Sequence, residues 1–169
     1  MKKILMTSLA LSSFLFADTI YVSNEKDNTI SVIDSLTNTV KETIKVGQRP
    51  RGILLNNDKT QLYICASDDD TVQVLDLKTK KIIYNLPSGE DPEQFALTPD
   101  GKELYVSNED DAIVTVVDTV NRSVVTQIEV GVEPEGMAVS PDGTVAINTT
   151  ETSNFLHWID TKTKKIIHN

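Results

Sequence analysis

Short runs in which apolar and polar residues alternate follow one another from Ile20 to Ile167, separated by turn residues. The stretch 92–131 shows the pattern clearly, with alternating runs at 93–98, 103–108, 112–118 and 123–130. A period of two predicts β-strands, and Pro99-Asp100-Gly101 between the first two runs predicts a tight turn. Nothing in the pattern has the period of a long amphipathic helix, so the hydrophobic pattern predicts an all-β chain.

The same unit returns every 42 residues. Equivalent positions are Asp34, Asp76, Asp118 and Asp160; Gly47, Gly89 and Gly131; and Pro50, Pro92 and Pro134. A fixed period near 40 with four strands per unit is typical of propeller blades. The sequence therefore predicts a β-propeller of four-stranded antiparallel blades. We expect the four aspartates to cap the turn after each third strand, because an Asp side chain bonds the backbone two residues on.

About four blades are present, and their predicted bounds are 18–47, 48–89, 90–131 and 132–169. The first has three predicted strands and the last has three and a short fourth, so the ring is expected to be incomplete. We interpret the chain as the N-terminal part of a longer propeller. The alternatives are a natural four-bladed propeller, or two copies that pair into an eight-bladed ring with one inner strand lacking in each. Self-association through the open blade faces is a further expectation.

Four-residue motifs add a resemblance. Tyr21-Val22-Ser23-Asn24 and Tyr105-Val106-Ser107-Asn108 resemble the motif of the YVTN-repeat β-propellers, although the second blade departs from it at Tyr63-Ile64-Cys65-Ala66. Within that family the chain is most similar to exported propellers that accompany PQQ-dependent alcohol catabolism. The resemblance implies a binding scaffold without a catalytic motif, possessing no cofactor of its own.

The first 17 residues have a different character. Lys2 and Lys3 precede an apolar run from Ile4 to Phe16, and Ala17 is followed by Asp18. This layout predicts a secretory signal peptide, and the run is short for a membrane anchor, which is the alternative. We therefore expect a periplasmic or secreted protein. Cys65, the only cysteine, is expected to be a small residue inside a strand rather than a reactive thiol.

Charge is unevenly distributed between the two faces on which the connections lie. The net charge is −9, which argues against nucleic-acid or anionic-membrane binding. One face carries 14 acidic residues against Lys26, Arg49 and Arg51, while the other is near neutral. The acidic face is the predicted binding surface for an unidentified protein or small ligand; the alternative is a solvated surface that keeps the protein soluble. Its candidate residues are Arg49, Arg51, Asp68, Asp69, Asp70, Glu90, Asp91, Glu93, Glu133 and Glu135.

Two details of this face have competing interpretations. Arg49 and Arg51 flank Pro50 and either hold an anion at the mouth of the channel or form salt bridges between neighbouring loops. Asp68-Asp69-Asp70 lacks the spacing and the glycine of a calcium loop, so no metal is predicted there.

Signals for enzymatic chemistry are weak. His157 and His168 are the only histidines, and the chain has no haem-attachment motif, phosphate loop or nucleophile elbow. The sequence therefore predicts a protein that is not an enzyme, and an accessory role in PQQ-dependent alcohol oxidation. The alternative is the propeller domain of a quinone- or haem-linked oxidoreductase whose cofactor ligands lie in other blades. A purely structural surface-layer role is a third hypothesis.

Overall fold

The computed structural model describes residues 18–169, so the predicted signal peptide lies outside the described part. These residues form four antiparallel sheets, the first three-stranded and the others four-stranded. The strands are β1 (Thr19–Asn24), β2 (Thr29–Asp34), β3 (Thr39–Lys45), β4 (Pro50–Leu55), β5 (Gln61–Ala66), β6 (Thr71–Asp76), β7 (Lys81–Pro87), β8 (Pro92–Leu97), β9 (Glu103–Asn108), β10 (Ile113–Asp118), β11 (Ser123–Glu129), β12 (Pro134–Val139), β13 (Val145–Thr150), β14 (Leu156–Asp160) and β15 (Lys165–His168).

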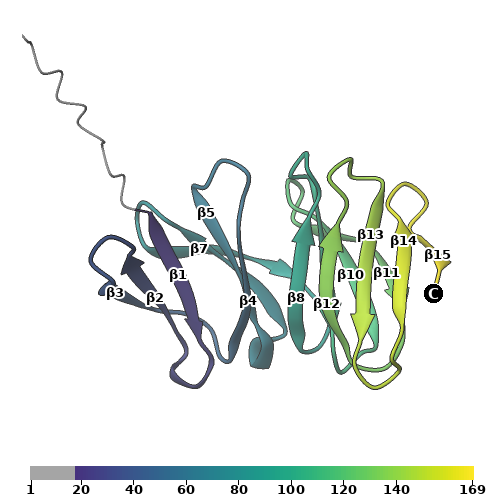
Figure 1. The fold of residues 1–169 in the computed structure, drawn as a ribbon, viewed down its shortest axis with the longest axis horizontal. Coiled ribbons are helices and arrows are strands. Elements are labelled where there is room, and N and C mark those ends of the chain that lie inside the picture. Colours follow the sequence, from purple (N-terminus) through teal and green to yellow (C-terminus); the bar gives the residue numbers. More distant parts are fainter. Residues whose placement is uncertain (1–17) are drawn as a thin grey trace, which may run out of the picture.

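Within each sheet the strands neighbour one another in chain order, which is the topology of a propeller blade. The sheets follow one another in a row from β1 to β15 (Figure 1). The inner strands β4, β8 and β12 lie against one another, and β1 lies against β4. Over residues 18–169 the ring is not closed. The predicted all-β propeller with an open ring is therefore confirmed.

The connections lie at two ends of the blades. The turn end holds the hairpins β2–β3, β4–β5 and their equivalents; the loop end holds β1–β2, the passages between blades, and their equivalents. At the turn end Asp118 accepts hydrogen bonds from the backbone N–H of Val120 and Asn121, at 2.8 and 2.7 Å. Asp34 does the same for Leu36 and Thr37. The predicted turn role of these aspartates is confirmed.

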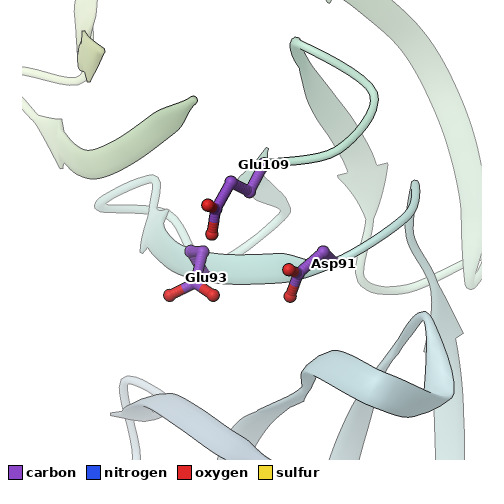
Figure 2. Close-up of side chains that lie close together, drawn as sticks. All are labelled: Asp91, Glu93 and Glu109. Atoms are coloured by element: carbon purple, nitrogen blue, oxygen red, sulfur yellow. The ribbon is translucent and has the colours of Figure 1, made fainter. Parts of the chain in front are cut away.

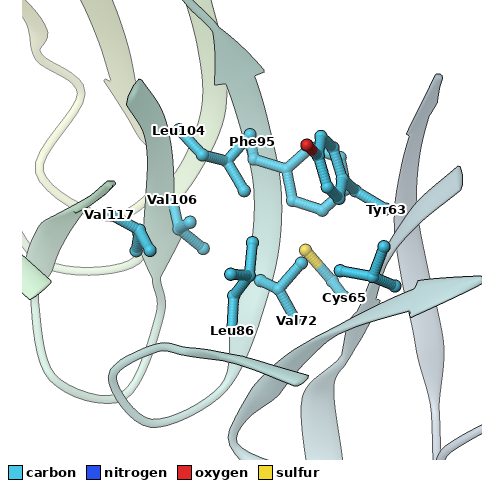
Figure 3. Packing of buried hydrophobic residues seen from close by; sticks show 9 residues of the cluster. Tyr63, Cys65, Val72, Leu86, Phe95, Leu104, Val106 and Val117 are labelled. Atoms are coloured by element: carbon cyan, nitrogen blue, oxygen red, sulfur yellow. The ribbon is translucent and has the colours of Figure 1, made fainter. Parts of the chain in front are cut away.

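Apolar side chains from facing blades form the core. Between the second and third blades, Tyr63 meets Phe95 edge-on with ring centroids 6.5 Å apart (Figure 3). Cys65 belongs to this cluster and is fully buried, and burial raises the pKa of its thiol. The thiol is thus a packing residue, as expected. No helix among residues 18–169 is long and apolar enough to cross a membrane.

Repeated glycines allow the chain to pass closely from one blade to the next. A Cβ on Gly47 would lie 2.7 Å from that of Ala66, and one on Gly89 would lie 2.6 Å from a carboxylate oxygen of Asp111. These contacts are shorter than real Cβ atoms make, so the 42-residue glycine spacing records a steric requirement. The passages after these glycines deliver the chain to the inner strands, where the charged residues gather.

Candidate functional site: a charged cluster at the loop end

Glu93, the second residue of inner strand β8, is at the centre of the site. Its side chain is 1% exposed. On the neighbouring inner strand, a Cβ on Gly52 would lie 2.7 Å from the Glu93 carbonyl oxygen, so the two backbones approach closely because position 52 has no side chain. The close approach of β4 and β8 encloses the carboxylate of Glu93 between them.

Two arginines from the second blade neutralise this carboxylate. Arg51 places Nη2 2.5 Å from Glu93 Oε2, and Arg49 places Nη2 3.2 Å from Glu93 Oε1. Arg49 also contacts Asp91 through Nη2, and its Nε lies 3.1 Å from Asp68 Oδ1 in a geometry too poor for a hydrogen bond. The predicted salt bridges between neighbouring loops are therefore confirmed for both arginines, whereas anion binding by them remains a prediction.

Backbone geometry holds these residues at the strand entrance. Arg49, Asp91 and Glu133 each precede a proline and have positive φ values of 49°, 48° and 58°. Such angles are uncommon for residues with side chains. Side chains of the preceding blade support two of them: the Arg49 N–H donates to Asn28 Oδ1 at 2.9 Å, and the Asp91 N–H donates to Asp70 Oδ1 at 3.0 Å.

Three carboxylates converge beside the arginines. Glu109 reaches from the loop after β9 toward Glu93 and Asp91 (Figure 2), and oxygens of the three groups lie within 4.8 Å of one another. Such a spacing suits a bridging cation, but the Arg49 guanidinium already contacts Asp91 and Glu93. The positive charge that balances this cluster is supplied by arginine in the structure.

Burial dominates the electrostatics of Glu93. It raises the pKa of that carboxyl to about 7, against the opposing effect of Arg51 and with further increases from Asp91, Glu135 and Glu109. The pKa of Glu109 is also raised, first by burial and then by Asp91. The cluster can therefore exchange a proton near neutral pH.

Other predicted residues serve the loops themselves. Asp69 Oδ2 accepts the Gln48 N–H at 2.8 Å, and in the next blade Asp111 Oδ2 accepts the Glu90 N–H at 2.7 Å. The Glu133 carboxylate accepts a hydrogen bond from the Thr152 hydroxyl. The structure thus brings five candidates together: Arg49, Arg51, Asp68, Asp91 and Glu93. The remaining ones lie in the surrounding loops, except Glu135, which is the second residue of inner strand β12.

The candidate set omitted two members of the cluster, Glu25 and Glu109. Glu25 Oε1 lies 3.3 Å from Arg51 Nη1. Glu109 is the repeat equivalent of Ser67. The Ser67 N–H donates to the carbonyl of Arg49, and the Glu109 N–H donates in the same way to the carbonyl of Asp91, so the repeat contained a signal for Glu109. Aligning the repeats by position would have placed Glu109 beside Asp91.

Neither histidine faces this cluster. His157 is buried in β14, where Nε2 accepts the Gly131 N–H at 3.1 Å and Nδ1 lies 2.7 Å from Asn169 Oδ1. His168 is exposed on outer strand β15, with its ring 6.4 Å from that of Trp158.

The repeat, the sheet order and the close-packed inner strands define an open β-propeller. The chain belongs to two overlapping propeller families, the YNCE-like beta-propellers, whose model matches residues 2–108, and the cytochrome D1 heme domains, whose model matches residues 56–169. Among solved structures, Kuenenia stuttgartiensis hydrazine synthase is similar, with a TM-score of 0.82 and 25% identity over 89% of this chain. The chain spans 45% of that protein's length. No protein of curated function matches the sequence.

These matches correct one prediction. The expectation that the protein is not an enzyme is wrong, because a cytochrome heme domain model matches residues 56–169 and a similar solved structure is that of a synthase. The sequence motifs for enzymatic chemistry were weak because the repeated residues of a propeller serve blade packing and not chemistry. The matches support a β-propeller family and do not bear on the predicted association with PQQ-dependent alcohol catabolism.

Proposed function

We propose that this chain is the propeller portion of a haem-linked oxidoreductase. The observation that carries the proposal is the match of residues 56–169 to the cytochrome D1 heme domain. The similarity to hydrazine synthase, over nearly the whole chain, supports the same class of protein. Export to the periplasm is part of the proposal and rests on the residues before Asp18. A link to PQQ-dependent alcohol oxidation remains a prediction from resemblance alone.

Among the described residues, the histidine, cysteine and methionine side chains do not form a haem-iron site, and His168 lies apart on the exposed outer strand β15. Both ring nitrogens of His157 are already engaged, and Cys65 is enclosed between two blades. Met137 packs into the core between the third and fourth blades. The arginines that could meet haem carboxylates are paired with Asp91 and Glu93. We infer that axial ligands come from outside residues 18–169, and that haem would supply electron transfer when bound there.

With the axial ligands supplied from outside residues 18–169, the chain's own residues have two tasks. The blades form a rigid frame, and the loop end presents an acidic surface that favours a cationic partner by long-range attraction. The Glu93 cluster, at the entrance of the inner strands on the same end, can gain or lose a proton near neutral pH, because burial raises the pKa of Glu93 to about 7.

The test is to purify the protein from its natural host together with whatever polypeptides accompany it. Absorption spectra and the pyridine haemochrome assay are expected to show haem in the preparation, while the chain of 169 residues purified alone is expected to bind none. Haem absent from the host preparation, with added haem failing to bind, would overturn the proposal. Haem bound tightly by the isolated chain would overturn the assignment of the ligands to other segments.

A further inference from the structure

Two carboxyl groups meet at the loop end of β8, where Glu109 points toward Glu93 (Figure 2). One oxygen atom from each side chain lies within 4.8 Å of the other. A hydrogen bond with Glu93 contributes to the pKa of Glu109 and lowers it. Two ionised carboxylates have no hydrogen between them, so this bond requires a proton on one of the two groups.

The direction of the bond and the burial of the two groups both assign this proton to Glu93. A bond that lowers the pKa of Glu109 stabilises Glu109 as the ionised acceptor, so Glu93 is the donor. The Glu93 side chain is 1% exposed, whereas Glu109 is half-buried. Since burial disfavours the charged form, the buried member holds the proton and the half-exposed member carries the charge.

The charges around the pair favour the uptake of a proton. Two arginines face five carboxyl groups, so full ionisation would leave an excess of negative charge around a carboxyl that water does not reach. The other titratable groups that act on Glu93 from packed strands are Glu135 on β12 and the Cys65 thiol on β5, and neither supplies a positive charge. The seven groups in contact are Arg49, Arg51, Glu25, Asp68, Asp91, Glu93 and Glu109.

The arginines allow this proton to leave Glu93 and return. When it passes from Glu93 to Glu109, the carboxylate left behind is stabilised by Arg51 Nη2 at 2.5 Å and by Arg49 Nη2 at 3.2 Å. The protonated Glu109 can then donate to water or to a ligand at the loop end. Uptake of a proton from solvent by Glu109, followed by transfer to Glu93, restores the starting state.

We propose that Glu93 and Glu109 form an acid–base site that shares one proton, in which Glu93 stores the proton and Glu109 exchanges it with a ligand at the loop end. The site suits a ligand that takes up a proton, as the products of a reduction do. That choice of ligand rests on the proposed function, whereas the shared proton does not depend on haem.

The test is a pH titration, followed by NMR, of the full-length protein labelled with ¹³C at the glutamate side-chain carboxyl carbons. Glu93→Gln and Glu109→Gln assign the two signals. In the parent protein, uptake of one proton near neutral pH is expected to shift both signals. Replacing H₂O by D₂O should also shift both, because one exchangeable proton lies between the two groups. These measurements on the parent do not depend on how well a variant folds.

Two substitutions that remove the same charge separate proton sharing from simple repulsion. By charge alone, Glu135 raises the pKa of Glu93 more than Glu109 does, so repulsion predicts the larger change for Glu135→Gln. Sharing predicts the reverse order, because a glutamine amide at position 109 can donate to ionised Glu93. Glu109→Gln should lower the proton affinity of Glu93 by about tenfold or more, and Glu135→Gln by less. Circular dichroism checks that each variant is folded.

Several outcomes would overturn the proposal. They are an equal or larger change for Glu135→Gln, an isotope shift confined to one carboxyl carbon, and a Glu93 carboxylate that is still ionised at pH 5. Calcium chloride alone is the remaining probe: displacement of the proton by the added ion at neutral pH would assign the cluster to a cation. Haem is not measured in this titration, so its failure is distinguishable from failure of the proposed function.

Discussion

The pKa values of carboxylates are shifted in opposite directions at the two ends of the same blades. At the turn end, the pKa of Asp118 is lowered by hydrogen bonds from Asn121 and Val120, and that of Asp142 is lowered by bonds from Ser140 and Thr144. At the loop end, burial raises the pKa values of Glu93 and Glu109. The difference shows that hydrogen-bond donors near a carboxylate, and not the residue type, determine how its ionisation affects the stability of this fold.

The free energy of unfolding should therefore decrease as the pH is lowered through the aspartate range, and also as the pH is raised toward 7, for different reasons. The aspartates of the turn end have lowered pKa values, so their contribution is present above the unfolded pKa and is lost as the pH falls. Glu93 has a raised pKa, so the folded state keeps a proton that the unfolded chain releases; its contribution is lost as the pH rises from about 4.5 to about 7.

The largest expected effect comes from removing the charge of Glu93. The difference in unfolding free energy between Glu93→Gln and the parent should change by about 3 kcal/mol between pH 4.5 and pH 8, because the glutamine cannot ionise. Denaturant unfolding of both proteins at several pH values measures it. The variant should be the more stable at pH 8; parallel pH profiles for the two proteins would contradict the raised pKa.

Removing the partner of Glu93 should have a slightly smaller effect. Arg51→Ala leaves a buried carboxylate with Arg49 alone. The expected cost is about 2 kcal/mol at pH 8, less than for a fully buried pair because the Arg51 side chain is 31% exposed. The cost should shrink at pH 5, where Glu93 is protonated. Arg122→Ala is a useful control, since Arg122 stacks on Tyr84 at 3.7 Å and pairs with no buried acid. An equal loss at both pH values for Arg51→Ala would show that packing, and not charge, is responsible.

The smallest effect belongs to the turn end. Asp118→Ala removes the acceptor of two backbone N–H groups in an exposed hairpin, so the melting temperature should fall less than in Arg51→Ala. The loss should disappear on acidification, when the parent aspartate is protonated too. Thermal unfolding followed by circular dichroism at pH 7 and pH 3 checks this, and a loss undiminished at pH 3 would refute it.

Most of the fold could be predicted from the sequence because the repeat is regular. The step from Asp34 to Asp76 fixes where each third strand ends, and Gly47 and Gly89 mark the passages between blades. The left-handed backbone at Arg49 and Asp91 had no such signal, since neither is a glycine or asparagine. Those angles depend on hydrogen bonds that the two backbone N–H groups donate to Asn28 and Asp70, which belong to the preceding blade.

The site was predictable only in outline. The pairing of Arg51 with Glu93 was one of two interpretations, because the residues share a repeat position in adjacent blades. Burial of Glu93 to 1% exposure could not be predicted, since it depends on how closely Gly52 lets two inner strands approach. The enzymatic class was missed for another reason: no described residue shows the chemistry that the family name implies.

The contact between Arg51 and Glu93 joins a residue to its own counterpart one blade later. Arg49 and Asp91 form a second pair of the same kind. In an array of identical duplicated blades, each of these positions would meet a copy of itself, and like charges would repel in a buried place. A freshly duplicated blade could not keep this arrangement. Divergence at these two positions between the second and third blades therefore replaces repulsion by attraction, whereas Glu93 still has an acidic counterpart, Glu135, one blade later.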